Sequence, residues 1–316
     1  MAHNTITFVS MNCQGLSGAF KRADTLNFLR SKKYSIYFLQ DTHFTDKEEN
    51  YIRTQWGFEC YFSNFTSQSR GVAILFNNNF EFSIHNIIKD NNGNKLILDI
   101  TIEGKRLTLI NIYGPNRDSP EFYNEIFIYL KNNSNPVIMA GDFNLVLDPG
   151  LDMKNYLNVN NPKAREEILN LILECNLVDC WRELNIETYQ YTWRKKNTNK
   201  QARLDFFLIS ESLFMDVIDA KIVPGYKTDH SLIFVSLKFG KFSPGKSFWK
   251  FNNSLLKDQL FVTEVKTVIE DTKTNYWLRT GNNNSTPVNE IPVKDLQLSI
   301  DDQLFFDVLL MEIRGI

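Results

Sequence analysis

The chain has 316 residues, of which 43% are hydrophobic and 23% charged, as is typical of a globular protein with a sizeable core. No apolar run approaches the roughly 18 residues that a membrane helix needs, so we expect no membrane partner. The first residues lack the basic and apolar segments of a signal peptide, and we therefore expect a protein that is not secreted.

The cysteines, histidines and charges narrow the function further. Four cysteines without a Cys-x-x-Cys pair, and only four histidines, argue against a zinc site or a disulfide framework. Any metal would then have oxygen ligands, which favours Mg²⁺ or the similar Mn²⁺. A net charge of −2 does not indicate a nucleic-acid binder, but the segment 194–203 contains five basic residues and no acidic one.

The first part of the chain alternates strand-like and helix-like segments, which indicates a layered α/β fold. Residues 5–11 are β-branched and aromatic, as in a strand, and Asn12 ends them. The spacing of residues 19–29 predicts a helix, and a second apolar strand over residues 36–39 ends shortly before Asp41. A short helix is expected over residues 45–56, and further strands at 59–63, 71–76, 81–88, 96–102 and 107–113.

The middle of the chain contains its most distinctive stretch, residues 137–144. An apolar run leads into Gly141, after which Asp142 and Asn144 lie two residues apart. In an extended segment such residues face the same side, so both would project from the end of a core strand. Helices are expected from Pro120 and over residues 161–175, strands at 189–193 and 204–209 would form a hairpin around the basic segment, and residues 230–237 would form a final strand.

A cluster of Gly, Ser and Pro at residues 240–245 predicts a domain boundary. We expect one domain over residues 1–239 and an extension over residues 240–316. Within the extension, apolar residues at a spacing of four predict an amphipathic helix over about residues 293–314, after a linker at residues 279–287.

Polar side chains lie at or next to the ends of the predicted strands. Each one by itself is most often a turn, cap or packing residue. Together they favour a convergent site, because catalytic groups gather on loops held by a rigid scaffold. These residues are Asn12, Asp41, Tyr113, Asp142, Asn144, Asp205, Asp229 and His230.

The chemistry of this set suits hydrolysis of a phosphodiester. A hard cation held by Asp41 would stabilise added negative charge and the leaving oxygen. A carboxylate such as Asp205 would fix the tautomer of His230 and stabilise its charged form. Asp142 could align the attacking water, and the neutral donors Asn12, Tyr113 and Asn144 could contact phosphate oxygens.

An ordered set of motifs over residues 5–239 resembles the exonuclease III-like phosphohydrolases, the superfamily of apurinic/apyrimidinic endonucleases, DNase I and inositol-polyphosphate 5-phosphatases. Within it, the chain is most similar to the endonuclease domain that begins the second open reading frame of LINE-type non-LTR retrotransposons. The motifs are Ser10-Met11-Asn12, Leu39-Gln40-Asp41-Thr42-His43, Gly71-Val72-Ala73-Ile74, Asn111-Ile112-Tyr113-Gly114-Pro115, Gly141-Asp142-Phe143-Asn144, Tyr191-Thr192-Trp193, Leu204-Asp205 and Thr228-Asp229-His230.

The resemblance implies a DNase I-like, four-layered α/β sandwich of two packed mixed β-sheets flanked by helices, followed by a mostly helical C-terminal extension that leads towards a reverse transcriptase. It implies catalytic roles for the eight strand-end residues other than Asp41 and Asp229. Those two, with Asn12, would form the metal site. The family's metal-binding acid is usually glutamate, and Asp41 is one methylene shorter. We expect DNA contacts at Arg70, Thr192, Arg194, Lys195, Lys196, Lys200 and Arg203.

The resemblance therefore predicts a Mg²⁺-dependent endonuclease that nicks one strand of double-stranded target DNA. The 3′-hydroxyl left at the nick would prime reverse transcription of a retrotransposon. The expected partners are the target DNA, the remainder of the polyprotein and its RNA, with synthesis in the cytoplasm and function in the nucleus. The alternatives are an abasic-site repair endonuclease of the same fold, a catalytically weakened DNA-binding module and, less favoured by the basic hairpin loop, a small-molecule phosphatase.

Overall fold

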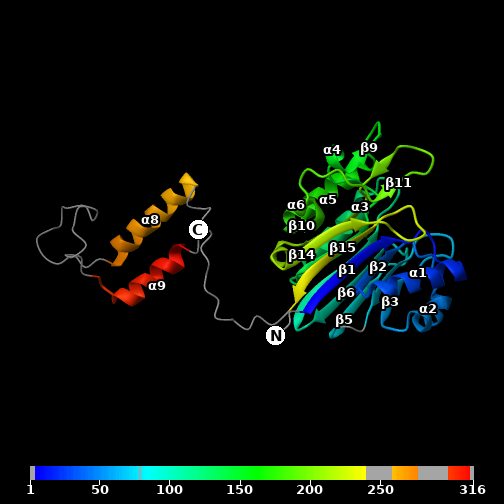
Figure 1. Ribbon diagram of the computed structural model, residues 1–316, viewed down its shortest axis with the longest axis horizontal. Coiled ribbons are helices and arrows are strands. Elements are labelled where there is room, and N and C mark those ends of the chain that lie inside the picture. The colour runs from blue at the N-terminus through cyan, green and yellow to red at the C-terminus, as the bar shows by residue number, and fades with distance from the viewer. Residues whose placement is uncertain (1–3, 78–79, 240–257, 277–297, 314–316) are drawn as a thin grey trace, which may run out of the picture. The chain divides into compact units, whose positions relative to one another are not determined.

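A computed structural model describes residues 4–77, 80–239, 258–276 and 298–313. They fall into two compact units, Met1–Phe242 and Ser243–Ile316. The larger unit contains two six-stranded sheets and a small three-stranded sheet (Figure 1).

The first sheet has the order β14-β15-β1-β2-β4-β3. Only β1 and β2 are parallel among its neighbouring strands, so the sheet is mixed. One face carries the core side chains Ile6, Phe8 and Phe38, while the neighbouring Val9 and Tyr37 face the other side, as the two-residue period of a strand requires. The strands are β1 (Asn4–Asn12), β2 (Ile36–Gln40), β3 (Cys60–Ser63), β4 (Val72–Phe76), β14 (Val217–Val223) and β15 (Leu232–Phe239).

The second sheet has the order β10-β13-β8-β7-β6-β5 and is also mixed, because β7 and β8 run parallel. Its inner face, with Leu98, Leu109 and Ile138, packs against the inner face of the first sheet in one buried cluster. The strands are β5 (Phe82–Lys89), β6 (Lys95–Ile102), β7 (Lys105–Tyr113), β8 (Val137–Asp142), β10 (Leu177–Asp179) and β13 (Asp205–Ser210).

Helices cover the outer faces of both sheets. On the first sheet, α1 (Ala19–Lys32) and α2 (Glu49–Trp56, after the 3₁₀ turn Asp46–Glu48) bury Leu26, Leu29 and Trp56. On the second, α3 (Pro120–Lys131) and α5 (Pro162–Glu174) bury Ile126 and Ile168. The expected fold class is therefore confirmed as a four-layered sandwich of helices, sheet, sheet and helices. Short helices are α4 (Pro149–Asp152), α6 (Cys180–Leu184) and α7 (Glu211–Phe214).

Hydrogen bonds between Gln40 and Asn111, near the ends of β2 and β7, join the two sheets. Asn111 on β7 accepts a hydrogen bond from the Gln40 amide on β2 at 2.7 Å, and donates to the carbonyls of Leu39 and Ala73 at 3.0 and 2.8 Å. Both side chains are fully buried, and the Gln40 N–H₂ group also donates to the buried Ser10 hydroxyl at 3.0 Å. A buried amide is costly unless it is hydrogen-bonded, so these hydrogen bonds favour one alignment of the two sheets over others.

The predicted strands and helices differ from the structure in a few places. Residues 217–223 form β14, which was not predicted from the sequence, and of the predicted strand 189–193 only Trp193 lies in a strand, β11 (Trp193–Arg194). β11 forms a small sheet with β12 (Gln201–Ala202) and β9 (Met153–Lys154), so the basic segment is the loop of a hairpin whose second strand is β12. The predicted second strand, residues 204–209, instead corresponds to β13, which pairs with β8 and β10.

The smaller unit contains α8 (Gln259–Tyr276) and α9 (Asp302–Ile313), which pack with Tyr276 edge-on to Phe305 at 6.4 Å between ring centroids. Of the predicted helix 293–314, the described residues 298–301 are not helical, and the helix α9 begins at Asp302. The predicted linker 279–287 lies outside the described residues. No helix of the described part of the chain is long and apolar enough to cross a membrane.

Candidate active site

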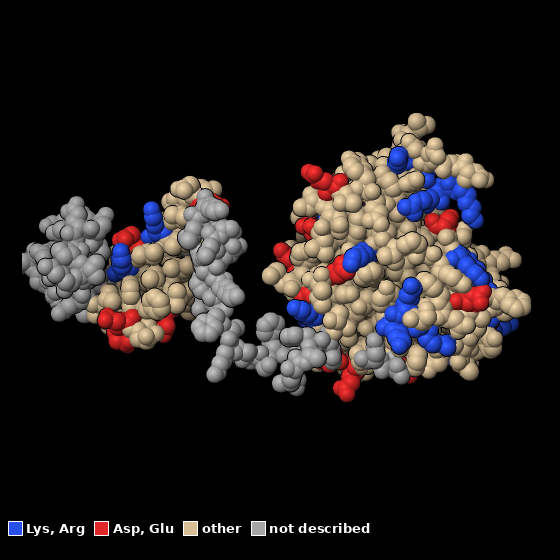
Figure 2. All heavy atoms as spheres, viewed as in Figure 1, with Lys and Arg blue, Asp and Glu red and all other residues tan. Residues whose placement is uncertain are grey.

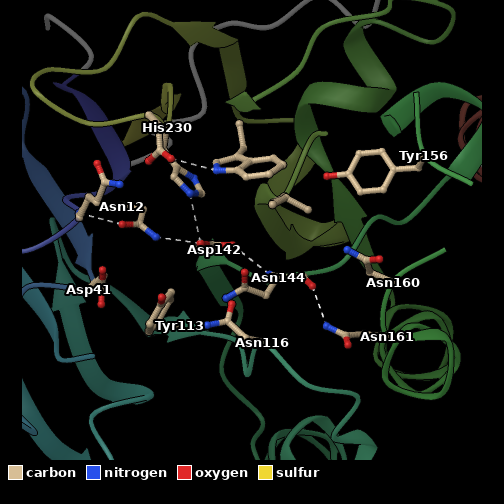
Figure 3. A pocket seen from close by; sticks show the side chains of 14 residues that line it. Asn12, Asp41, Tyr113, Asn116, Asp142, Asn144, Tyr156, Asn160, Asn161 and His230 are labelled. Carbon is tan, nitrogen blue, oxygen red and sulfur yellow. Dashed lines mark hydrogen bonds and ion pairs between the residues drawn. The ribbon is translucent and has the colours of Figure 1, made fainter. Parts of the chain in front are cut away.

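The strand-end residues meet at a cavity of about 310 Å³ (Figure 3). Seven of the eight residues singled out in the sequence line it, and Asp205 lies directly behind His230. The full lining consists of Asn12, Gln14, Asp41, Tyr113, Asn116, Asp142, Asn144, Tyr156, Asn160, Asn161, Trp193, Leu204, Asp229 and His230.

The strand registers explain why these residues meet. In the second sheet, Asp142 at the end of β8 lies opposite Tyr113 of the parallel β7 and opposite Asp205 at the start of the antiparallel β13. In the first sheet, Asn12 ends β1 beside Gln40, the residue before Asp41. Parallel strands end at the same edge of a sheet, and an antiparallel strand begins there, so residues as far apart in sequence as Asp142 and Asp205 become neighbours.

His230 lies between two buried carboxylates. Its Nδ1 is 2.9 Å from Asp205 Oδ2, and its Nε2 is 3.7 Å from Asp142 Oδ2. The Asn12 amide donates to the same Asp142 oxygen at 2.8 Å, and the Asn144 backbone N–H donates to the other at 2.9 Å. The imidazole, at 8% exposed, is therefore held by Asp205 with its second nitrogen facing Asp142 and the cavity.

Burial and the neighbouring charges together raise the pKa of both Asp142 and His230. Burial raises the pKa of Asp142, the charge on His230 lowers it and that on Asp205 raises it, with a net result of about 7. Burial lowers the pKa of His230, but Asp205 and Asp142 outweigh it and raise the value to about 9. At slightly alkaline pH, Asp142 is thus an unprotonated base and His230 a cation.

Tyr113 and Asn144 provide neutral groups at the cavity wall. Burial raises the pKa of Tyr113 well above its ordinary range, and the charges on Asp41 and Asp142 raise it further, so the phenol stays protonated. The Asn144 amide donates one hydrogen bond to the Gly114 carbonyl at 2.7 Å, which leaves its second N–H for another acceptor.

Two sets of side chains have the chemistry of a metal site. Asp41, Asn12 and Asp229 line the cavity with carboxylate and amide oxygens, the ligands that Mg²⁺ prefers. Asp142, Asp205 and His230 also offer ligand atoms that all lie within 4.8 Å of one another. The second set is already joined by the His230–Asp205 hydrogen bond, so Asp41, whose carboxylate makes no contact with that cluster, fits a hard cation better.

The structure corrects the expected DNA contacts at two positions. The Arg203 guanidinium is 1% exposed and bonded to Asp152 at 2.7 and 2.9 Å, with a further ion pair to Asp179 at 2.7 Å. Thr192 is also fully buried, and its hydroxyl accepts from the backbone N–H groups of Leu204 and Asp205 at 2.9 and 3.1 Å. Both residues shape the site from inside the protein and do not reach solvent.

The remaining basic candidates are accessible. Arg194, Lys195 and Lys196 are exposed and Lys200 is half-buried, with its ammonium 5.3 Å from the Tyr156 ring. Arg70 is half-buried and stacks on Phe65 at 4.6 Å. Figure 2 shows Lys and Arg side chains gathered around the position that β11 has in the same view of Figure 1.

Seven lining residues were not among the sequence candidates. Trp193 and Leu204 belong to recognised motifs and Asn116 adjoins one, so these three could have been found from the motifs. Tyr156, Asn160 and Asn161 carry no local signal, because they come from a loop whose course depends on the hairpin and on α5. The remaining one is Gln14.

The fold and this site are those of a phosphoesterase. The chain belongs to the endonuclease/exonuclease/phosphatase family, whose model matches residues 9–230. It is 29% identical over 271 residues to a Xenopus laevis protein described as transposon TX1 uncharacterized 149 kDa protein, over 83% of this chain and 20% of that protein. The chain thus spans about a fifth of this relative. A Bacillus subtilis exodeoxyribonuclease is 24% identical, over 68% of this chain and 92% of the relative.

Solved structures show the same fold. The AP endonuclease of Leishmania major superposes with a TM-score of 0.65 at 18% identity, over 75% of this chain and 88% of that one. An AP endonuclease of Archaeoglobus fulgidus superposes with a TM-score of 0.61 at 19% identity, over 73% and 98%.

Proposed function

We propose that the chain is a Mg²⁺- or Mn²⁺-dependent endonuclease that nicks one strand of duplex DNA and leaves a 3′-hydroxyl. The observation that carries this proposal is the buried Asp205–His230 pair beside Asp142, at a cavity that Asp41 also lines. Such a site has a base, a cationic donor and a carboxylate for a hard cation, which together meet the needs of phosphodiester hydrolysis.

Asp142 is the base in this mechanism. Its carboxylate is aligned by the Asn12 amide and the Asn144 backbone N–H, and a pKa of about 7 matches that of an efficient base at neutral pH. It accepts a proton from a water whose oxygen attacks phosphorus. The bond from phosphorus to O3′ breaks, and the O3′ oxygen takes a proton from solvent to become the 3′-hydroxyl. The phosphate remains as the 5′-phosphate of the downstream strand.

His230 stabilises the charge that develops on the phosphate. The charges on Asp205 and Asp142 keep the imidazole protonated despite its burial, so its Nε2–H can donate to a non-bridging phosphate oxygen. Tyr113 adds a neutral hydroxyl donor, because its phenol remains protonated. Preorganised donors of this kind are most effective where water is excluded.

Asp41, with Asn12 and Asp229, would hold the cation. When bound, a hard cation supplies charge neutralisation for the phosphate and the leaving O3′ oxygen. The protein's own part is to present these oxygen ligands at the wall facing Asp142.

DNA would contact the exposed basic residues of the hairpin loop and Arg70. Contacts of this kind go mainly to phosphates, so they position the duplex without reading its sequence. The likeness to a transposon protein over 83% of this chain supports a role in target-primed reverse transcription. In that role the partners are the remainder of a polyprotein with a reverse transcriptase and its RNA, and the site of action is the nucleus.

A supercoiled-plasmid assay with and without Mg²⁺ tests the proposal. His230→Ala and Asp142→Ala should each lower the nicking rate by at least about 10²-fold, because each removes a group that acts in proton transfer or charge stabilisation. His85→Ala is the matched control, since His85 is exposed and hydrogen-bonded to Thr101. Nicking that survives both active-site changes in folded protein would contradict the assignment.

Abasic-site repair is the alternative within the same fold. Oligonucleotide duplexes with and without a single abasic site separate the two functions. The proposed enzyme cuts the intact duplex at least as fast as the abasic one, whereas a repair enzyme prefers the abasic duplex strongly.

A further inference from the structure

The loop that follows β2 carries Asp41 and is fixed on both sides. The Gly15 N–H donates to the Asp41 carbonyl at 2.8 Å, and on the other side the His43 N–H donates to the Arg70 carbonyl at 2.8 Å. Asp41 and His43 both adopt positive φ angles, 51° and 58°, which residues with side chains seldom do. Such backbone persists only where its surroundings determine it strongly.

Two donors converge on one oxygen of the Asp41 carboxylate. His43 Nε2 lies 3.0 Å from Oδ1, and because a carboxylate only accepts, this nitrogen is the donor. The Arg70 backbone N–H donates to the same Oδ1 at 3.0 Å. Oδ2 accepts no hydrogen bond from the part of the chain that the structure describes, and Asp41 lines the cavity.

The His43 ring has a specific place in the fold. A Cβ on Gly15 would lie 2.7 Å from His43 Nδ1 and 3.0 Å from Cε1, so the ring packs against a position that leaves no room for a larger residue. Gly71 packs as closely on Thr42, the residue before His43, since a Cβ on Gly71 would lie 2.6 Å from Thr42 Oγ1. Both glycines have positive φ angles, at which a residue with a side chain would be strained.

We propose that His43 is a positioning residue, which acts with the Arg70 backbone N–H to hold Asp41 Oδ1 so that Oδ2 faces a divalent cation in the cavity. This inference rests on the proposed function for the assignment of the cation to Asp41. A free aspartate side chain can present either oxygen, whereas two donors on Oδ1 leave only one. Partners that orient a metal-ligating carboxylate in this way commonly change metal affinity by 10- to 100-fold, roughly, when they are removed.

Binding of Mn²⁺ to the full chain without DNA, measured by calorimetry, tests the proposal apart from activity. His43→Ala should weaken Mn²⁺ binding by about 10-fold or more. His43→Gln should recover part of this loss, because a glutamine amide can also donate to Oδ1. His85→Ala, far from the cavity lining, should bind Mn²⁺ as the wild type does.

The proposal is overturned if folded His43→Ala binds Mn²⁺ as tightly as the wild type, or if His43→Gln is no better than His43→Ala. Circular dichroism checks the fold, and if His43→Ala does not fold, His43→Gln must bind Mn²⁺ more tightly than Asp41→Ala for the proposal to hold. A wild type that binds Mn²⁺ through Asp41 but nicks no plasmid would contradict the proposed function and leave the role of His43 standing.

Discussion

The three buried groups His230, Asp205 and Asp142 depend on one another for their charge states. Asp205 Oδ1 has no hydrogen-bond partner among the described residues, so its charge is balanced mainly by the imidazole that bonds to Oδ2. A charge buried without a partner is very costly, and this favours keeping the His230 proton in the folded protein. The same interaction that holds the ring in place therefore also sets its charge.

The nicking rate should follow a bell-shaped pH profile with its maximum at about pH 8. Activity rises as Asp142 loses its proton around pH 7 and falls as His230 loses its own around pH 9. Rates at constant ionic strength from about pH 6 to about pH 10 test this expectation.

Asp205→Asn provides the control for the alkaline limb. Asp205 raises the pKa of His230, so without its charge the fall in activity should move to lower pH. An alkaline limb that stays in place would show that another group titrates there.

The hairpin β11–β12 is held in place by a group of buried charged side chains at the end of β12. Arg203 follows β12 and pairs with Asp152 and Asp179, and Asp152 also pairs with Arg182 at 2.6 Å. The Arg203 guanidinium lies 4.4 Å from the centroid of the Phe206 ring. The residue that looked like one more cation of a DNA-binding loop instead fixes the base of that loop.

Arg203→Met should therefore lower the free energy of unfolding, by about 3 kcal/mol or more, because two carboxylates lose a buried partner. Lys195→Ala, at an exposed position, should change it by less than about 0.5 kcal/mol. Urea unfolding of both variants provides the measurement. A stable Arg203→Met protein with weakened DNA binding would restore the original interpretation.

Over the whole molecule, the net charge of −2 gives no general attraction to DNA. In the proposed function, attraction comes from the local distribution of charge, in which the basic hairpin loop follows Trp193, a residue of the cavity lining. The C-terminal unit contributes a different kind of surface. Among its described residues, the large exposed apolar side chains are Leu260, Leu304, Phe306 and Met311.

DNA affinity should depend on salt through this small number of cations. Lys195→Ala combined with Lys196→Ala should reduce the slope of log affinity against log salt by about 2, because each phosphate contact contributes roughly 0.9. Lys131→Ala, on the outer helix α3 and paired with Glu174, should leave the slope unchanged. Binding to one duplex at several salt concentrations distinguishes these outcomes, and equal slopes would place the DNA elsewhere.

Much of the site could be predicted from local sequence. Strands were visible from runs such as 36–39 and 107–113, because β-branched and aromatic residues pack well in sheets. The polar residues just beyond them stood out because nothing in a core strand requires Asp142 or Asn144. The family resemblance carried by the motifs then implied the four layers.

Partners and burial could not be read in the same way, since they depend on residues distant in the chain. Arg203 and Lys200 look alike in the sequence, yet one is buried against Asp152, 51 positions away, and the other is half-buried by the Tyr156 ring. The three cavity residues of the 156–161 loop had no signal for the same reason.

The amino-acid sequence by itself determined which residues end each strand, because alternation and turn chemistry act over a few positions. The tertiary structure alone decided which of those ends meet and how they are charged. Asp142 reaches a pKa of about 7 because packing removes water and brings His230 and Asp205 beside it. Asp41 Oδ1 is likewise held by His43 of its own loop and by the Arg70 N–H, which comes from a loop 29 positions away and reaches it only in the folded chain.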